Sequence, residues 1–154
     1  MQIRILAVAK KPSRWVAEAE ADFTKRLQPY AKLQIDLVNP VDENAFGIEE
    51  SSKRESENLL KKLSKDEFLI ACDLRGKSFT STDLAQEIGK LQDNSQKVCF
   101  LIGGSNGLSA EILAKANLKI SFGKITLPHE LFRVVLFEQI YRSFTILNNK
   151  RYHK

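Results

Sequence analysis

The sequence has few of the residues from which disulfide frameworks and metal centres are built. It holds two cysteines and two histidines among 154 residues. Cys72 and Cys99 lie far apart, each inside an apolar run, and no C-x-x-C pair occurs. His129 and the glutamate after it do not continue into H-E-x-x-H, because position 133 is Arg133. We therefore expect two buried free thiols, with neither a disulfide framework nor a metal site.

Long apolar runs are missing as well. No stretch approaches the roughly 18–20 consecutive apolar residues that a membrane-spanning helix needs. The first eight residues have the pattern of a strand and lack the basic start, apolar run and small-residue cleavage site of a secretory signal. We therefore expect a cytoplasmic protein with no membrane association.

The sequence also lacks repeats, low-complexity tracts and Pro/Gly-rich linkers. A hydrophobic share of 43% and a charged share of 28% are ordinary for globular proteins. A chain of this length can bury one sizeable core. We therefore expect a single domain over residues 1–154.

Basic residues are concentrated near the C-terminus. The net charge is +5, and residues 119–154 hold seven Lys or Arg against two Glu. Residues 36–66 have the opposite balance, with five Lys or Arg against eight acids. A clustered basic surface is typical of proteins that bind a phosphate-rich partner such as RNA. Charge alone leaves open a protein that is merely basic.

Strand-like and helix-like segments alternate along the chain. Short β-branched or apolar runs predict strands, of which two are continuous enough to be buried parallel strands. Capping residues such as Ser109 and the Ser81–Asp83 cluster precede helical patterns. The alternation predicts an α/β fold with a largely parallel sheet. The expected strands are residues 3–9, 33–38, 68–72, 98–102 and 118–122, and the expected helices are 12–27, 48–63, 84–91, 109–116 and 131–147. We expect a loop at 39–47, and the charged helix at 48–63 should be a solvated outer helix.

The helix expected at 131–147 is apolar around most of its circumference. Its main stripe is flanked on both sides by further apolar residues, so it must be buried on more than one side. The sheet can cover one face, and a second copy of the chain could cover another, which predicts a homodimer. Burial inside a thick monomer core is the alternative. The stripe consists of Phe132, Leu136, Ile140, Phe144 and Leu147.

Three expected strand ends carry unusual residues, at 72–77, 102–107 and 122–129. Ligands of parallel sheets bind beyond the carboxyl ends of the strands. Gly103 and Gly104 allow a ligand to approach the backbone closely. Their surroundings match neither G-x-G-x-x-G nor the phosphate-binding G-x-x-x-x-G-K-[ST] loop. A ligand site and a plain strand-to-helix turn both remain open here.

Two other segments have a pattern that suits a nucleotide or RNA. The loop at 122–127 has no acidic residue, and its backbone could hydrogen-bond an adenine edge. His129 and Arg133 lie four apart and share a helix face, which suits either an RNA backbone or a structural ion pair. The C-terminal Tyr152 stands among cations and could stack on a base, although chain ends are usually frayed.

Taken together, these segments resemble the RlmH family, the pseudouridine N3-methyltransferases of large-subunit ribosomal RNA within the SPOUT superfamily. The resemblance covers the whole chain. It rests on Ile5–Lys10, Ile102–Leu108 (Ile-Gly-Gly-Ser-Asn-Gly-Leu), Leu127-Pro128-His129, Arg133-Val134-Val135, Glu138-Gln139, Tyr141-Arg142 and Tyr152-His153-Lys154.

The resemblance implies a deep trefoil knot in the C-terminal part, a homodimer, and a pseudouridine substrate on the assembled ribosome. It also implies S-adenosylmethionine as the cofactor. Small departures from the family pattern occur at Ala9, Cys72 and Gly123, where glycine, leucine and serine are usual. The implied cofactor-binding residues are Cys72, Gly103, Phe122, Gly123, Lys124, Ile125, Thr126 and Leu127.

The resemblance places Tyr152, His153 and Lys154 on the substrate side of the site. His153 could accept the N3 proton, because histidine titrates near neutrality. Lys154 or Arg133 could instead stabilise the imide anion. We favour positioning with charge stabilisation over a dedicated base. The alternatives are a non-catalytic RNA- or ribosome-binding module and a flavodoxin-like mononucleotide binder that uses residues 10–13 as an anion loop.

Overall fold

The computed structural model describes all residues from 1 to 154, and its strands form one five-stranded sheet in the order β2-β1-β4-β3-β5. Every pair of neighbouring strands is parallel. This confirms the α/β fold with a parallel sheet that the sequence predicts. The strands are β1 (Gln2–Val8), β2 (Lys32–Val38), β3 (Glu67–Ser78), β4 (Lys97–Ile102) and β5 (Leu118–Ser121).

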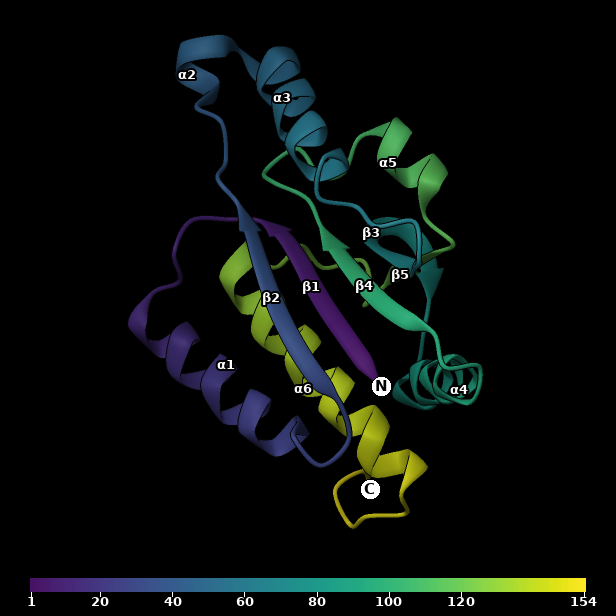
Figure 1. Cartoon of the computed structure of the whole chain (residues 1–154). Helices are drawn as coiled ribbons and strands as arrows, with labels where there is room; N and C mark the ends of the chain where they lie inside the picture. Colours follow the sequence, from purple (N-terminus) through teal and green to yellow (C-terminus); the bar gives the residue numbers. More distant parts are fainter.

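Helices cover both faces of the sheet. Figure 1 shows α6 running between α1 and α4, and these three helices pack on one face. The helices α3 and α5 pack on the other face. The helices are α1 (Arg14–Leu27), α2 (Glu43–Phe46), α3 (Ile48–Leu60), α4 (Ser81–Asp93), α5 (Ala110–Lys115) and α6 (His129–Leu147). None of them is both long and apolar enough to cross a membrane.

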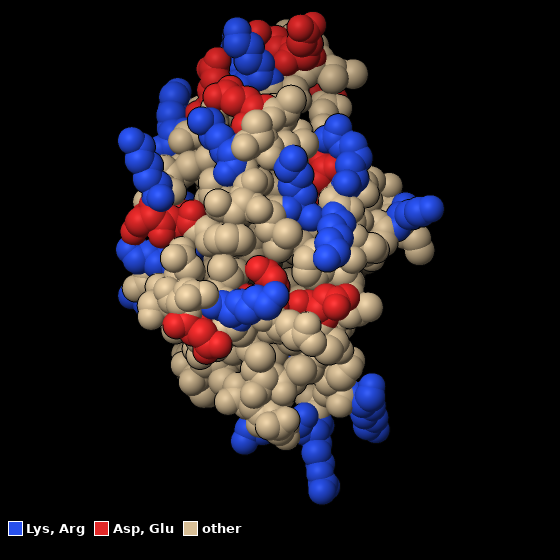
Figure 2. Space-filling view, turned by 90° about the vertical axis from the view of Figure 1, so that its right-hand side faces the viewer, with Lys and Arg blue, Asp and Glu red and all other residues tan.

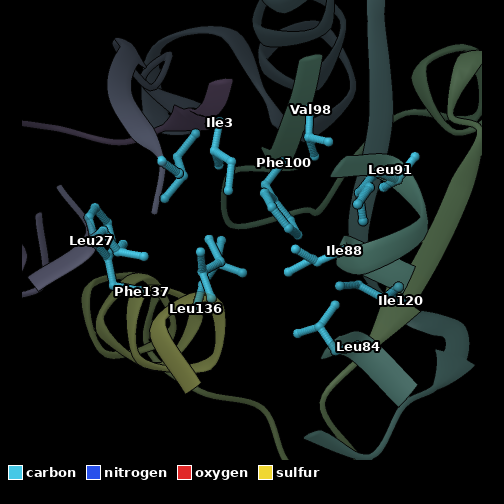
Figure 3. Close-up of a cluster of buried hydrophobic side chains, with 14 of the residues drawn as sticks. Ile3, Leu27, Leu84, Ile88, Leu91, Val98, Phe100, Ile120, Leu136 and Phe137 are labelled. Atoms are coloured by element: carbon cyan, nitrogen blue, oxygen red, sulfur yellow. The ribbon is translucent and has the colours of Figure 1, made fainter. Parts of the chain in front are cut away.

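The inner strands are apolar on both sides because each side meets a layer of helices. In β1, Ile3 and Ile5 point into the core shared with α1, α4 and α6, whereas Leu6 and Val8 point toward α3 and α5. Side chains of a strand alternate between its two faces, so a strand buried on both sides needs a continuous apolar run. Figure 3 shows the larger core, where Phe100 of β4 lies among side chains of α4 and α6.

Capping residues set the starts of two helices. The Ser109 side chain accepts a hydrogen bond from the backbone N–H of Ile112, as the prediction of a capped helix requires. The helix α4 begins at Ser81, three residues before the start expected at residue 84. Its N-cap is Thr80, which forms a reciprocal capping box with Asp83.

Three expectations about local structure were wrong. The segment after Cys72 is not a loop, because β3 continues to Ser78 and pairs with β5 again from Lys77 onward. The loop expected at 39–47 contains the short helix α2. The helix expected to be solvated at 48–63 is α3, which is buried on one side. Its Leu59 packs against the sheet, and its Glu55 lies against Gly104 in the turn that follows β4.

Most of the apolar surface of the long helix α6 is covered by other elements of the same chain. The sheet, α1 and α4 surround it on three sides. On its remaining outer side, Leu131 is exposed, and Val134 and Val135 are half-buried. The nineteen residues of α6 separate its two ends by about 27 Å.

Candidate functional site

A cavity of about 500 Å³ lies at the carboxyl ends of β4 and β5, beside the part of β3 that follows its last pairing with β4 at Cys72. Its size is within the range of pockets that hold small molecules. All three strand ends that the sequence singles out contribute to its walls, and α6 contributes from its first turn. The lining residues are Cys72–Arg75, Ile102–Gly107, Ile120–Gly123, Ile125–Leu127, His129 and Phe132.

The turn after β4 is packed so closely that only glycine fits at positions 103 and 104. A Cβ atom on Gly103 would lie 2.3 Å from the carbonyl carbon of Gly107, and a Cβ atom on Gly104 would lie 2.5 Å from Oε2 of Glu55. Real Cβ atoms do not approach other atoms so closely. A backbone hydrogen bond from the N–H of Gly107 to the carbonyl of Gly104, 2.9 Å long, closes the turn. The turn therefore presents bare backbone to the cavity.

Two glutamates from the α2–α3 segment hold this turn from outside the cavity. Glu43 accepts hydrogen bonds from the side chains of Ser105 and Asn106, the latter at 2.7 Å. Glu55 is buried, and its Oε1 accepts a hydrogen bond from the backbone N–H of Val41 at 2.9 Å. The acidic segment at 36–66 thus contributes structural carboxylates beside the cavity.

The loop from 122 to 127 leaves most of its backbone hydrogen-bonding groups unpaired within the chain. None of its N–H or C=O groups takes part in a backbone–backbone hydrogen bond. Only Gly123 is engaged locally, through its N–H and carbonyl with the Ser121 hydroxyl. Beside the loop, the rings of Phe122 and Phe132 stack with centroids 5.4 Å apart. Free backbone groups next to an aromatic wall suit a flat heterocycle.

The charged groups of the cavity come from the extension of β3. Asp73 receives two hydrogen bonds from the Arg75 guanidinium, at 2.9 and 3.0 Å, and this partner lowers the pKa of the Asp73 carboxyl. Asp73 is therefore an anion at neutral pH. Burial raises the pKa of the Cys72 thiol, so Cys72 is a neutral, weakly polar part of the wall.

Seven of the eight residues assigned to the cofactor line this cavity. They are Cys72, Gly103, Phe122, Gly123, Ile125, Thr126 and Leu127, and Lys124 does not line it. Their role in binding stays a prediction. Sequence patterns did not identify Ile120 or Phe132 as site residues, because apolar residues in a strand or helix carry no sign of facing a ligand.

Arg133 does not line the cavity. Its Nη2 lies 2.5 Å from Oε1 of Glu20 on α1, and both side chains are almost fully buried. Of the two readings of the His129–Arg133 pair, the structure therefore supports the structural ion pair for Arg133. His129, one turn earlier, does line the cavity.

The C-terminal residues fold back from the end of α6 onto the middle of that helix. Tyr152 folds back onto α6, and its hydroxyl donates a hydrogen bond of 3.1 Å to Glu138. Its ring packs edge-on against Tyr141 at 5.0 Å. The tail is therefore docked and not frayed at Tyr152. Glu138 is nine residues along α6 from His129 of the cavity, about 13 Å of helix axis, and none of residues 152–154 lines the cavity.

Charges are distributed unevenly over the surface. In Figure 2 the lowermost tip, where Figure 1 places the C-terminus, carries Lys and Arg side chains with no acid among them. Asp and Glu gather at the upper end, near α2 and α3. No group of three or more His, Cys, Asp or Glu side chains is arranged to hold a metal ion.

Comparisons with known proteins agree on one family. Residues 1–153 match the model of the family described as "Predicted SPOUT methyltransferase". The chain is 44% identical to Ribosomal RNA large subunit methyltransferase H of Carboxydothermus hydrogenoformans and 43% identical to that of Bacillus pumilus, each over the full length of both chains. A solved structure of a probable methylase family protein from Haemophilus influenzae shares the fold, with a TM-score of 0.59 and 19% identity over 99% of this chain and 70% of that one. The chain belongs to the SPOUT methyltransferases and, within them, to the family of ribosomal RNA large subunit methyltransferase H.

Proposed function

We propose that this protein is an S-adenosylmethionine-dependent methyltransferase that modifies N3 of a pseudouridine in large-subunit ribosomal RNA on the assembled ribosome. The family membership supports methyl transfer to ribosomal RNA. The observation that carries the cofactor assignment is the cavity at the carboxyl edge of the sheet, where three strand ends and the start of α6 meet. A cytoplasmic location follows from such a substrate.

The residues around the cavity suit S-adenosylmethionine. The free backbone groups of residues 122–127 would hydrogen-bond the adenine edge, and Phe122 and Ile120 would flank its ring. Gly103 and Gly104 line the cavity without side chains, so a ligand could approach their backbone closely. The Asp73 carboxylate is the anion of the cavity and would complement a cationic ligand.

When bound, S-adenosylmethionine supplies a methyl group, whose carbon bonds to the substrate nitrogen as its bond to sulfur breaks and the electron pair stays on sulfur. The chain's residues must hold the nitrogen in line with that bond. Such positioning can contribute on the order of 7–11 kcal/mol. Tyr152, His153 and Lys154 would hold the base and stabilise the charge that develops on its imide.

None of Tyr152, His153 and Lys154 lines the cavity of its own chain. Glu138 holds Tyr152 on the middle of α6, about 13 Å along the helix from His129. We therefore propose a homodimer in which the tail of one protomer completes the cavity of its partner. The exposed Trp15 and Leu131, with the half-buried Val134 and Val135, offer an apolar outer surface near the start of α6 for such an interface.

We also propose the trefoil knot that the family resemblance implies. After β5, which lies at the edge of the sheet, the chain returns to place α6 in the middle of the helical layer between α1 and α4. This return beneath β4 and β1 is compatible with threading. A knotted chain should refold from denaturant with a slow phase that persists when every X-Pro bond starts trans.

Calorimetric titration with S-adenosylmethionine tests the proposed function most cheaply. We expect one molecule of S-adenosylmethionine to bind per chain, and S-adenosylhomocysteine to displace it. A non-catalytic RNA-binding module would bind RNA without binding the cofactor. A mononucleotide binder would instead be stabilised by FMN or phosphate, with Lys10 and Lys11 as the cations.

A further inference from the structure

Side chains from the middle of α6 and from the C-terminal tail form a polar cluster outside the cavity. Glu138 lies at its centre. Its Oε1 accepts hydrogen bonds from Nε and Nη2 of Arg142, at 2.9 and 2.6 Å, and from the Tyr152 hydroxyl at 3.1 Å. Its Oε2 accepts a hydrogen bond of 2.6 Å from the side chain of Gln139. Both oxygens of this carboxylate are therefore occupied.

The cluster is anchored to a second helix. The Ser81 hydroxyl at the start of α4 donates a hydrogen bond of 2.7 Å to Oε1 of Gln139, which fixes the amide that contacts Glu138. The Arg142 guanidinium also lies over the Tyr152 ring, 4.8 Å from its centroid. A guanidinium held by a carboxylate and an aromatic ring has little freedom to rotate.

One nitrogen of Arg142 remains and faces His153. Its Nη1 lies 3.4 Å from Nδ1 of the imidazole. Arginine can only donate hydrogen bonds, so Nδ1 must be the acceptor. If Nδ1 carried a hydrogen, two N–H donors, Nη1 of Arg142 and Nδ1 of His153, would point at each other. The second ring nitrogen, Nε2, must then carry the hydrogen of the neutral ring.

From this geometry we infer that Arg142 fixes His153 in the Nε2–H tautomer, so that His153 serves the reaction as a hydrogen-bond donor and not as the base. The inference rests on the proposed function and assigns a role within it. Nδ1 is occupied by Arg142, and Nε2 has no lone pair free to take a proton. Arg142 and Glu138 are positioning residues, because they act on the substrate through His153.

A donor at this place suits the chemistry of an imide. Nitrogen N3 of the pseudouridine base lies between two carbonyl groups, and loss of its proton spreads negative charge onto their oxygens. His153 Nε2–H would donate to one of these oxygens, while the N3 proton leaves to solvent water. The nitrogen then bonds to the methyl carbon. Such a donor matters most in the transition state, so it acts on kcat more than on KM.

Nitrogen-15 NMR of the histidine rings tests the tautomer directly on the full chain. In the range where the rings are neutral, we expect His153 to be wholly Nε2–H, and to become a mixture in Arg142→Leu. His129, the only other histidine, makes no side-chain hydrogen bond and is the internal reference. A His153 that carries hydrogen on Nδ1, or one unchanged by Arg142→Leu, would overturn the inference.

The role of His153 as a hydrogen-bond donor is tested by measuring ribosome methylation with the two variants His153→Gln and His153→Leu. Glutamine at 153 can donate a hydrogen bond but cannot act as a base at neutral pH, whereas leucine can do neither. We expect kcat of His153→Gln to stay within about tenfold of the parent, and kcat of His153→Leu to fall about 100-fold. Equal losses in both variants, or no loss in either, would contradict the donor role. If the parent protein itself transfers no methyl group, the proposed function fails, while the NMR result still reports the tautomer.

Discussion

Arg133 of α6 and Glu20 of α1 form an ion pair that is almost completely buried, with 2.5 Å between Nη2 and Oε1. The pair joins α1 to the part of α6 that carries His129 and Phe132 into the cavity. Two nitrogens of Arg133, Nε and Nη1, are buried without a hydrogen-bond partner. The pair therefore holds the start of α6 in place, at the cost of an incompletely satisfied guanidinium.

Removal of either partner should destabilise the protein strongly. A lone buried charge costs about 3–5 kcal/mol, so Glu20→Ala or Arg133→Ala should lower the free energy of unfolding by that amount. The double variant Glu20→Ala/Arg133→Ala should lose much less than the sum of the two single losses, because it leaves no unpaired charge. Urea unfolding of the four proteins measures the coupling. Additive losses in the double variant would contradict a direct interaction.

The contact between Glu130 and Ser13 should make stability depend on pH. The Ser13 backbone N–H and hydroxyl donate to the Glu130 carboxylate at 2.7 and 2.8 Å, and the backbone bond is the main cause of its lowered pKa. The folded state thus binds this proton less tightly than the unfolded state. The contribution to stability is complete above the ordinary pKa of 4.5 and is lost as the pH falls through the lower folded value.

Glu130→Gln should therefore be less stable than the parent near neutral pH, and the difference should shrink in acid. Chemical unfolding at a series of pH values measures it. Glu57→Gln, on the exposed side of α3, is the control and should shift stability little at any pH. A difference for Glu130→Gln that stayed constant down to about pH 3 would show that ionisation is not its origin.

Gly103→Ala should abolish cofactor binding while leaving the helices folded. The new Cβ would meet the backbone of Gly107 and Leu108 at 2.3–2.7 Å, so the turn must open. We expect the affinity for S-adenosylmethionine to fall more than about tenfold in calorimetry. Gly89→Ala in α4 is the matched control, since its Cβ meets only the movable end of the Leu147 side chain. Unchanged affinity in Gly103→Ala would remove the turn from the site.

Deletion of residues 152–154 should abolish methylation and leave cofactor binding intact, because none of these residues lines the cavity of its own chain. Mixing this deletion with Gly103→Ala should restore activity. A mixed dimer has one intact cavity facing one intact tail. No recovery in dimers shown by mass to be mixed would contradict a site shared between protomers.

The apolar outer surface near the start of α6 should carry the dimer. Leu131→Glu would place a charge beside the exposed Trp15 and the half-buried Val134. We expect sedimentation at micromolar concentration to show a dimer for the parent and a monomer for this variant, with unchanged circular dichroism. Ile48→Glu, at an exposed apolar residue of α3, is the control and should remain dimeric.

Sequence patterns predicted the strands and most helix starts because these depend on neighbouring residues. Buried strands such as β4 are continuous apolar runs, and Ser109 caps α5 through a contact three residues away. Sheet geometry also grouped the three strand ends that line the cavity. Arg133 could not be placed in this way, since its burial depends on a carboxylate from another helix.

The position of the C-terminal tail also depends on a contact that local sequence patterns do not show. Composition alone could not decide whether Tyr152 is frayed or available to stack on a base. Its partner Glu138 precedes it by 14 residues, across a turn in which Asn149 has a left-handed conformation. The extension of β3 past Cys72 was also missed. It depends on pairing with β5, and a polar segment gives no sign of such pairing.

The most direct test of the central claim is methyl transfer to purified ribosomes that lack the modification, with the product mapped by mass spectrometry. We predict one methyl group per large subunit, transferred from S-adenosylmethionine to N3 of a pseudouridine, and no transfer by the Gly103→Ala protein. Failure of the parent protein to methylate large-subunit ribosomal RNA, under conditions where it binds the cofactor, would contradict the account.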